Sequence, residues 1–290
     1  MRAHLIGMAL TVASVVFPML CSAETIRLQA GKPREISFEL VSGYLIVAEG
    51  SIGNLNHLKF VLDTGTTRTF IDLRLAKQLA LPLESKVVLR LDTKIPVKSA
   101  LLPSLTLGPL QGENLTVNVA DLSHMGSSSA RMDAIVGLDL LESIPFQIDY
   151  RTMRVKFGPI PSLAERASMD IAPGLPVVSL GFQHAKSHLL IDTGARNIIL
   201  YQERFYSPSC DWKIVGTELW ADSIGGVITA KKGLFRGAAI GLDAGYHEAY
   251  LVHAPLNEAL SSVDGILSPT AFGIRLIGFD FDNHIVTWTR

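Results

Sequence analysis

The triplet Asp-Thr-Gly occurs twice, and it constrains the fold more than any other feature of the sequence. Asp63-Thr64-Gly65 follows the apolar run 60–62, and Asp192-Thr193-Gly194 follows the apolar run 189–191. A carboxylate at the end of a buried strand is costly unless partners compensate for its lost solvation. A single Asp-Thr-Gly is also an ordinary turn sequence. Two copies in the same context, 129 positions apart, instead predict two similar halves that each deliver one carboxylate to a shared site.

The rest of the sequence repeats with nearly the same spacing. Residues 174–178 repeat the pattern of residues 43–47, and Asp264 corresponds to Asp133, in both cases 131 positions later. The final hairpin keeps this spacing. Because identities are few, the repeat lies in residue type and order. It predicts a duplicated, β-rich unit of about 115 residues.

Most segments have the alternating or β-branched pattern of strands, and few have a helical one. A short helix is expected from Leu73 to Leu81, with Asp72 as its N-cap. Residues 158–176 have prolines and glycines at both ends of a possible short helix, which predicts a linker. The expected divisions are a signal peptide at 1–23, a first lobe at 24–157, a linker at 158–173 and a second lobe at 174–290.

The first 23 residues have the pattern of an export signal. A short basic start precedes a mostly apolar run from Leu5 to Leu20, and small residues follow before Glu24. An uncleaved membrane anchor is the alternative, but the apolar run is short for a membrane span. The expected mature protein is therefore exported, to a periplasm or to the outside, without stable insertion in a membrane.

Composition narrows the class of protein further. Hydrophobic residues make up 48% of the chain, charged residues 18%, and the net charge is −1. A packed core is expected, and no run of Lys and Arg suggests a nucleic-acid partner. The histidines have no metal-ligand spacing on a common helix, and no phosphate-binding glycine loop stands out. Neither a metal nor another cofactor is expected.

The paired triplets, each followed later by a matching apolar stretch such as Ile135-Val136-Gly137, resemble the pepsin and retropepsin class of aspartic proteases. The resemblance spans nearly all of the expected mature chain. It implies a mostly β, two-lobed acid-protease fold with short helices. Lobes this short resemble those of retropepsins more than those of pepsins. The resemblance implies a monomer, in which the two halves of a single chain form an internal pseudo-dimer. The implied partner is a peptide or protein substrate.

The resemblance implies that Asp63 and Asp192 are the catalytic residues. Two carboxylates about 3 Å apart cannot both ionise cheaply, so they share a proton and can act as base and acid on one water. Glycine after each threonine lets the backbone approach the carboxylates closely, which gives Gly65 and Gly194 a supporting role. The family resemblance also implies that the hydroxyls of Thr64 and Thr193 cross between the lobes.

The residue after each glycine differs between the halves. Thr66 can donate a hydrogen bond to the neighbouring carboxylate and favour its charged form, whereas Ala195 cannot. The hypothesis is that Asp63 carries more of the negative charge and Asp192 more of the proton.

Substrate-covering hairpins are expected between each triplet and the following apolar stretch. In the second half the predicted tip is 223–227, with Ile224, Gly225 and Gly226 as candidate substrate-binding residues. In the first half, 87–102 contains no glycine, and the turn is expected at Lys94-Ile95-Pro96. Ser268 stands where the first half has Gly137, which is a departure from the pattern.

Three readings remain open. The first is an endopeptidase that uses Asp63 and Asp192 on one water. The second is a non-catalytic module that keeps the cleft to bind peptides or proteins, and the third is a protease active only after removal of residues 24–42. Asp133 and Asp264 also correspond across the halves, and each is expected to make a structural contact at the start of its strand.

Overall fold

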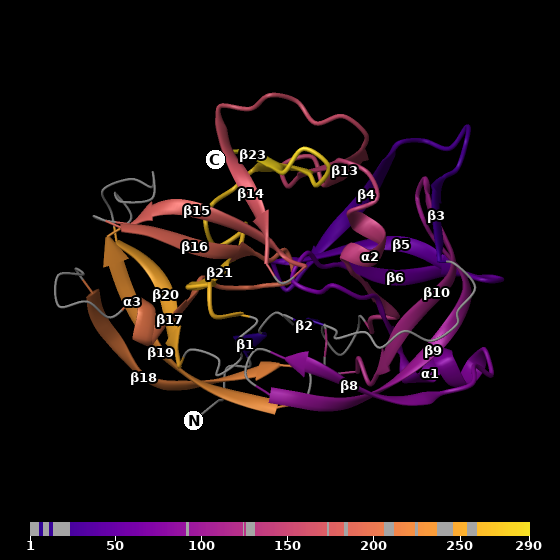
Figure 1. Cartoon of the computed structure of the whole chain (residues 1–290), viewed down its shortest axis with the longest axis horizontal. Helices are drawn as coiled ribbons and strands as arrows, with labels where there is room; N and C mark the ends of the chain where they lie inside the picture. Colours follow the sequence, from indigo (N-terminus) through magenta and orange to yellow (C-terminus); the bar gives the residue numbers. More distant parts are fainter. Residues whose placement is uncertain are drawn as a thin grey trace.

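The computed structural model describes residues 6–7, 12–13, 24–90, 93–123, 125, 131–172, 174–182, 185–205, 212–223, 226–236, 246–253 and 260–290. Strands dominate these residues, and the helices are short, as predicted. Two lobes lie side by side in Figure 1, the first in indigo to magenta and the second in orange.

The first lobe follows the order that the sequence predicts, with a triplet after a buried strand and a hairpin before the next apolar strand. Its elements are β3 (Thr25–Leu28), β4 (Glu35–Val41), β5 (Leu45–Ile52), β6 (Leu55–Leu62), β7 (Phe70–Asp72), α1 (Leu73–Gln78), β8 (Glu84–Arg90), β9 (Thr93–Leu107), β10 (Leu110–Ala120), β11 (Ala134–Val136), α2 (Leu138–Leu141), β12 (Phe146–Asp149) and β13 (Arg154–Phe157).

The second lobe repeats the strand order from β4 to β13, and its described residues form no helix at the position of α2. Its elements are β14 (Glu165–Ile171), β15 (Pro176–Phe182), β16 (Ala185–Ile191), β17 (Ile199–Tyr201), α3 (Gln202–Phe205), β18 (Trp212–Ser223), β19 (Gly226–Arg236), β20 (Tyr246–Val252), β21 (Gly265–Leu267), β22 (Leu276–Asp280) and β23 (Ile285–Thr289).

Strand pairing is the same around the two triplets. In the first lobe β11 is parallel to β6 and antiparallel to β7, while β10 is parallel to β7. In the second lobe β21 is parallel to β16 and antiparallel to β17, while β20 is parallel to β17. The duplication read from the spacing of the sequence therefore corresponds to a repeated sheet topology.

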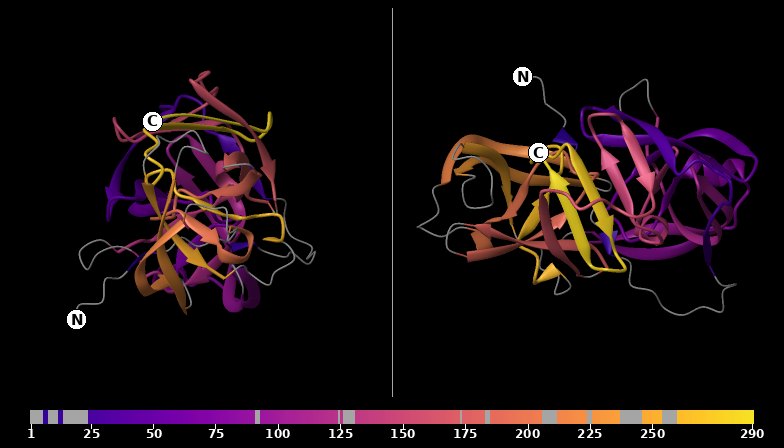
Figure 2. Two further views of the ribbon diagram at one scale, coloured as in Figure 1. Left: turned by 90° about the vertical axis from the view of Figure 1, so that its left-hand side faces the viewer. Right: turned by 90° about the horizontal axis from the view of Figure 1, so that it is seen from above.

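A third sheet joins the lobes in the order β4-β13-β12-β22-β23-β14. It lies at the top of Figure 1, and the view from above in Figure 2 shows β22 and β23 between the lobes. At its centre β12 pairs antiparallel with β22, and Phe146 stacks on Phe279 with ring centroids 5.0 Å apart. Such a stack of buried aromatic rings contributes to stability beyond its buried area.

This sheet corrects the expected linker. The possible short helix within 158–176 is wrong, because residues 165–171 form strand β14. β14 pairs with β15 as β4 pairs with β5: Met169 lies opposite Val178 and Phe38 lies opposite Ala48. The second repeat thus starts with β14, inside the range 158–173 that the sequence assigned to the linker.

A long hairpin extends from each lobe, and both lie at the bottom of Figure 1. β8 and β9 form the first hairpin, and β18 and β19 the second. The expected turn at 94–96 is wrong, because Pro96 lies in β9 opposite Val87 and the two strands close between Arg90 and Thr93. Pro96 precedes Lys98, the first β9 residue that pairs with β10, so its missing N–H can face an unpaired edge.

Two short strands lie in the expected signal segment. β1 (Ile6–Gly7) is parallel to β18 at Ala221 and Asp222, and β2 (Val12–Ala13) is antiparallel to β8. Among the described residues, no helix is long and apolar enough to cross a membrane. Cleavage before Glu24 stays a prediction.

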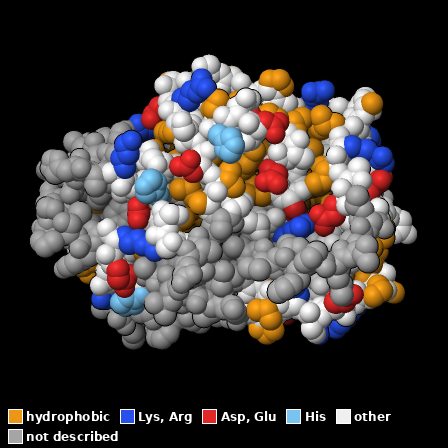
Figure 3. All heavy atoms as spheres, viewed as in Figure 1, with side chains coloured by type: hydrophobic (Ala, Val, Ile, Leu, Met, Phe, Trp, Pro, Cys, Tyr) orange, Lys and Arg blue, Asp and Glu red, His pale blue; other side chains and the backbone are white. Residues whose placement is uncertain are grey.

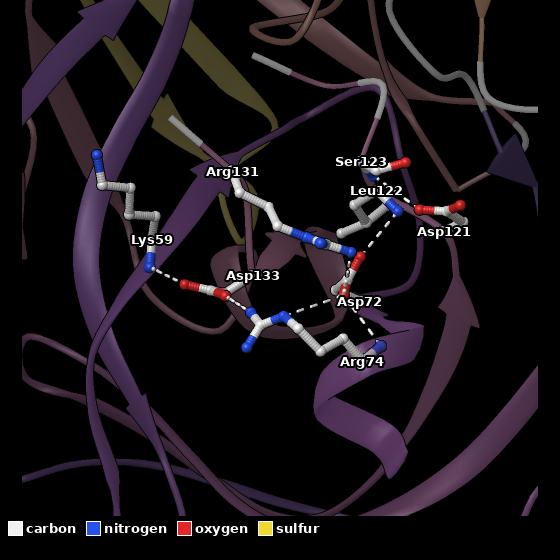
Figure 4. Close-up of polar contacts among 8 residues, drawn as sticks. All are labelled: Lys59, Asp72, Arg74, Asp121, Leu122, Ser123, Arg131 and Asp133. Carbon is white, nitrogen blue, oxygen red and sulfur yellow. Dashed lines mark hydrogen bonds and ion pairs between the residues drawn. The ribbon is translucent and has the colours of Figure 1, made fainter. Parts of the chain in front are cut away.

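A polar network ties α1 to the strands beside it (Figure 4). Asp72 is buried and caps α1 by accepting from the Arg74 backbone N–H at 3.0 Å, and it also accepts from Leu122 N–H at 3.0 Å and from Arg131 at 3.3 Å. Asp133 accepts from Lys59 N–H at 2.8 Å and pairs with the Arg74 side chain.

Helix α1 starts at the predicted residue, Leu73, but ends at Gln78, earlier than the predicted end at Leu81.

Asp264 repeats the contact of Asp133 in the second lobe. Its carboxylate accepts from His188 N–H at 2.9 Å, and its own N–H donates to His188 O at 2.8 Å. Asp133 does the same with Lys59. Both aspartates thus make the structural contact at the start of a strand that the sequence predicted.

On the face in Figure 3, described charged side chains of both signs are interspersed among hydrophobic ones.

Candidate active site

The two triplets lie at equivalent positions, directly after β6 and β16. Asp63 N–H donates to Val136 O and Asp192 N–H donates to Leu267 O, both at 3.0 Å. These bonds continue the parallel pairings of β6 with β11 and β16 with β21. Both aspartates are buried, with exposed fractions of 1% and 0%. The sheet therefore holds each carboxylate-bearing loop at the end of a buried strand.

The two threonines connect the lobes through reciprocal hydrogen bonds. Thr64 N–H donates to Thr193 Oγ1 at 3.0 Å, and Thr193 N–H donates to Thr64 Oγ1 at 3.1 Å. Each hydroxyl donates across the interface in turn, Thr64 to Ile191 O at 2.8 Å and Thr193 to Leu62 O at 3.0 Å. Both threonine N–H groups and both hydroxyls thus have partners across the interface, which fixes the relative position of the two loops.

The carboxyl groups face each other across the two glycines. Each aspartate accepts at 2.8 Å from the glycine N–H of its own triplet. A Cβ on Gly65 would lie 2.3 Å from Asp192 Cγ, and a Cβ on Gly194 would lie 2.7 Å from Asp63 Cγ. No other residue type leaves this space free, which is the physical reason for glycine at both positions. The two carboxyls consequently share one small buried volume.

Burial and mutual charge perturb both acids. Desolvation raises the pKa of Asp63 to about 6, while the neighbouring Asp192 and the N–H groups of Gly65 and Gly194 act in the opposite direction. Burial raises the pKa of Asp192 well above its ordinary value, and the negative charge of Asp63 raises it further. When this coupled pair loses its first proton, the negative charge lies preferentially on Asp63.

The order of ionisation matches the hypothesis from the sequence, but its stated cause was wrong. The Thr66 hydroxyl donates to Arg68 O at 3.1 Å and not to the Asp63 carboxylate. Asp63 instead interacts with backbone N–H groups from both loops. Among the described side-chain atoms, Asp192 Oδ2 is buried and accepts from no N–H or hydroxyl group. Because the Asp192 side chain also forms a hydrogen bond with the Asp63 side chain, it is well placed to carry the shared proton.

The substitution of Ser268 for Gly137 has a local reason. In the first lobe Leu138 N–H donates to Thr66 O at 2.9 Å. Proline follows Ser268 and has no N–H, so the Ser268 hydroxyl donates to the equivalent Ala195 O at 2.7 Å. The second loop thus keeps its hydrogen bond by a different donor.

The predicted tip of the second hairpin is described only in part. Gly226 begins β19 and pairs with Ser223, whereas Ile224 and Gly225 lie outside the described residues. Tyr44 was not singled out from the sequence. It is buried, and desolvation is the largest cause that raises its pKa; the charge of Arg196 opposes this rise, and the charges of Asp192 and Asp63 add to it. The charges of both carboxyls therefore act on Tyr44, although a Gly-Tyr at a strand start carries no sequence signal for this.

Within the described part of the chain, no group of three or more His, Cys, Asp or Glu side chains could hold a metal ion. The arrangement supplies two adjacent acids of different pKa, fixed by the threonines and open to hydrogen bonding at Asp192 Oδ2. Such a pair can accept a proton from water with one oxygen while donating a proton with another.

Comparison with known families agrees with this geometry. Residues 48–140 match a family model described as aspartyl protease. The resemblance to aspartic proteases is thereby confirmed. The matched stretch contains the first triplet, the first hairpin and β11, so the match covers the first-lobe half of the site.

One similar solved structure is that of an aspartic proteinase from Irpex lacteus. It is 12% identical, with a TM-score of 0.46, and the alignment covers 88% of this chain and 96% of that chain. No match was found among curated protein sequences.

Proposed function

We propose that the protein is an aspartic endopeptidase in which Asp63 and Asp192 activate one water for peptide-bond hydrolysis. The observation that carries the proposal is the packing of each carboxyl against the glycine of the opposite triplet. Recognition of an aspartyl protease family in residues 48–140 supports the reaction class. The repeated sheet topology supports an equal contribution from the second lobe.

The roles follow from the two pKa values. Asp63, the preferred anion, accepts a proton from water as the water oxygen bonds to the peptide carbonyl carbon. Asp192, the preferred acid, gives its proton to the carbonyl oxygen, which produces a neutral tetrahedral diol. When the C–N bond breaks, the proton on Asp63 passes to the leaving nitrogen and a diol proton returns to Asp192. The carboxylic acid and the amine are the products, and the pair regains its starting state.

The setting of the reaction is part of the proposal. A cleaved signal at residues 1–23 would deliver residues 24–290 as an exported monomer that contains both halves of the site. No cofactor takes part in the proposed steps. The substrate is a peptide or an unfolded protein segment bound between the two hairpins.

The test is cleavage of a denatured protein by residues 24–290 and by two variants, Asp63→Asn and Asp192→Asn. Each amide keeps the shape of the carboxyl but cannot exchange the proton that the mechanism needs. Each variant should lose about 10⁴-fold or more in kcat, as removal of an essential catalytic group does. Peptide binding with no turnover by the wild type, seen by calorimetry, would instead support a non-catalytic binding module.

A further inference from the structure

Another carboxyl, partly buried, lies behind the first catalytic loop and takes no part in the proposed reaction. Asp139, in α2, accepts from Thr69 N–H at 2.9 Å and from the Thr69 hydroxyl at 2.7 Å. Thr69 is fully buried, and its oxygen in turn accepts from Gly137 N–H at 3.2 Å. Residues 137–139 thus hold Thr69 by three hydrogen bonds.

The same short segment also holds the loop nearer to Asp63. Leu138 N–H donates to Thr66 O at 2.9 Å, and Asp139 N–H donates to Thr67 O at 3.2 Å. A Cβ on Gly137 would lie 2.8 Å from the Arg68 carbonyl carbon, so the two segments are in close contact. These contacts connect α2 and Asp139 to residues 66–69, which follow the catalytic triplet directly.

The second lobe does not repeat this carboxylate. Ile198 and Thr270 occupy the positions of Thr69 and Asp139. Thr270 Oγ1 lies 3.1 Å from Ser268 Oγ, so neutral hydroxyl groups complete the second loop. The first loop alone depends on an ionisable group.

We propose that Asp139 is a positioning residue, which as a carboxylate fixes residues 66–69 behind Asp63 and on protonation releases them. The hydrogen-bond pattern favours the ionised form. Asp139 Oδ2 accepts from the Thr69 N–H and Oδ1 accepts from the Thr69 hydroxyl. A proton on Oδ1 can be donated to Thr69 Oγ1 only if the hydroxyl turns round, and the buried Thr69 hydroxyl proton then loses this acceptor.

The charged groups around Asp139 affect the pH at which it ionises. Arg68 and Glu24 face it from the loop and from the chain before β3, Glu142 lies on its own element, and Lys86 of β8 lies close to Arg68 and Glu24. Desolvation raises the pKa of Asp139 to about 6, although the Thr69 donors and Arg68 favour the charged form. The carboxylate therefore predominates at pH 7.5 and the acid at pH 5.

This role rests on the proposed function, and it is tested by the pH dependence of two readouts in residues 24–290. The variant Asp139→Asn mimics the neutral form without changing shape. Its kcat should be about tenfold lower than that of the wild type at pH 7.5, since small misplacements of reacting groups are costly. The ratio of the two kcat values should approach one at pH 5, where the wild-type group is also neutral. A ratio that is constant with pH, whatever its size, overturns the proposal.

Two matched controls separate Asp139 from its neighbours. Glu142→Gln removes the adjacent carboxyl, and Thr270→Val removes the neutral counterpart in the second lobe. Neither should give a ratio to wild type that changes between pH 5 and pH 7.5. The same trend in Glu142→Gln would assign the titration to Glu142 and overturn the proposal.

Hydrogen exchange at Thr69 distinguishes failure of this role from failure of the proposed function. The protection factor of its N–H should be lower in Asp139→Asn than in the wild type at pH 7.5, and equal in both at pH 5. If the wild type cleaves no peptide but protection changes in this way, the protease assignment fails while the loop contact stands. If cleavage is normal and protection is unaffected at both pH values, Asp139 has no positioning role.

Discussion

The two catalytic loops follow equivalent strands but are held in place by different chemistry. In the first lobe a backbone N–H from Leu138 and a carboxylate from Asp139 hold residues 66–69. In the second, the hydroxyl of Ser268 holds Ala195. The carbonyl at equivalent positions is satisfied in both cases, because a buried carbonyl without a partner is costly. Conserved geometry thus requires a donor at that point and not a particular residue.

The comparison predicts the largest effect where the loops are most alike, at the two triplet glycines. Gly65→Ala places a methyl group 2.3 Å from Asp192 Cγ, and Gly194→Ala places one 2.7 Å from Asp63 Cγ. Both should lower kcat at least about 100-fold, because the carboxyls must separate. Gly65→Ala should be the worse of the two.

Steady-state cleavage kinetics measure this prediction. Gly216→Ala in β18 is the control, because its new methyl would meet the Lys232 side chain and not a carboxyl. Activity within a factor of about three of wild type in Gly65→Ala would show that the carboxyls do not share one volume.

The next largest effect is predicted for a variant that removes the difference between the two loops at Gly137. Gly137→Ser copies the second-lobe residue into the first lobe, where its Cβ would lie 2.8 Å from Arg68 C and 3.0 Å from Thr66 O. Because both contacts are with backbone, the free energy of unfolding should fall by about 2–3 kcal/mol, as overpacking of a core does. Urea denaturation measures it. An unchanged midpoint would mean that the first loop has the room of the second.

The reciprocal change should cost less. Ser268→Ala leaves Ala195 O without its donor, and Pro269 cannot replace it. The expected loss of stability is about 1–2 kcal/mol, the cost of one unpaired buried carbonyl. A matched variant, Ser143→Ala, removes a hydroxyl that donates to Leu140 O at 2.7 Å at a partly exposed site, and it should cost less. Equal losses in both variants would contradict the role assigned to Ser268.

The smallest effect is predicted at Thr66, where the loops differ next to the aspartates. Because its hydroxyl donates to Arg68 O, Thr66→Ala should leave the acidic limb of the pH–rate profile unchanged within about 0.3 pH units, although the structure would lose about 1 kcal/mol. A larger shift of that limb would restore the original hypothesis of a direct bond to Asp63.

The sequence was sufficient for features that depend on spacing. The offsets of 129 and 131 positions place both triplets after equivalent strands, and they predict the contacts of Asp133 and Asp264. A repeat carries this information because each half must solve the same packing problem. The short helix after Asp72 also follows from local capping chemistry.

Features decided by competition between nearby partners could not be read from the sequence. Thr66 can reach either a carboxylate or a carbonyl, and only the folded loop selects Arg68 O. Proline is typical of turns, yet Pro96 lies within a strand, where its missing N–H can face an unpaired edge. Asp139 follows the start of a short helix, where an acidic residue is ordinary, and its contact with Thr69 spans 70 positions.

The most direct test of a shared carboxyl pair is the pH profile of kcat/KM for residues 24–290. Activity requires one proton on the pair. It should fall on the acid side as both groups protonate, with an apparent pKa near 6, and on the alkaline side as Asp192 ionises above it. The account predicts a bell-shaped profile that vanishes in Asp192→Asn. A profile with one limb only, or cleavage that persists in Asp192→Asn, would contradict it.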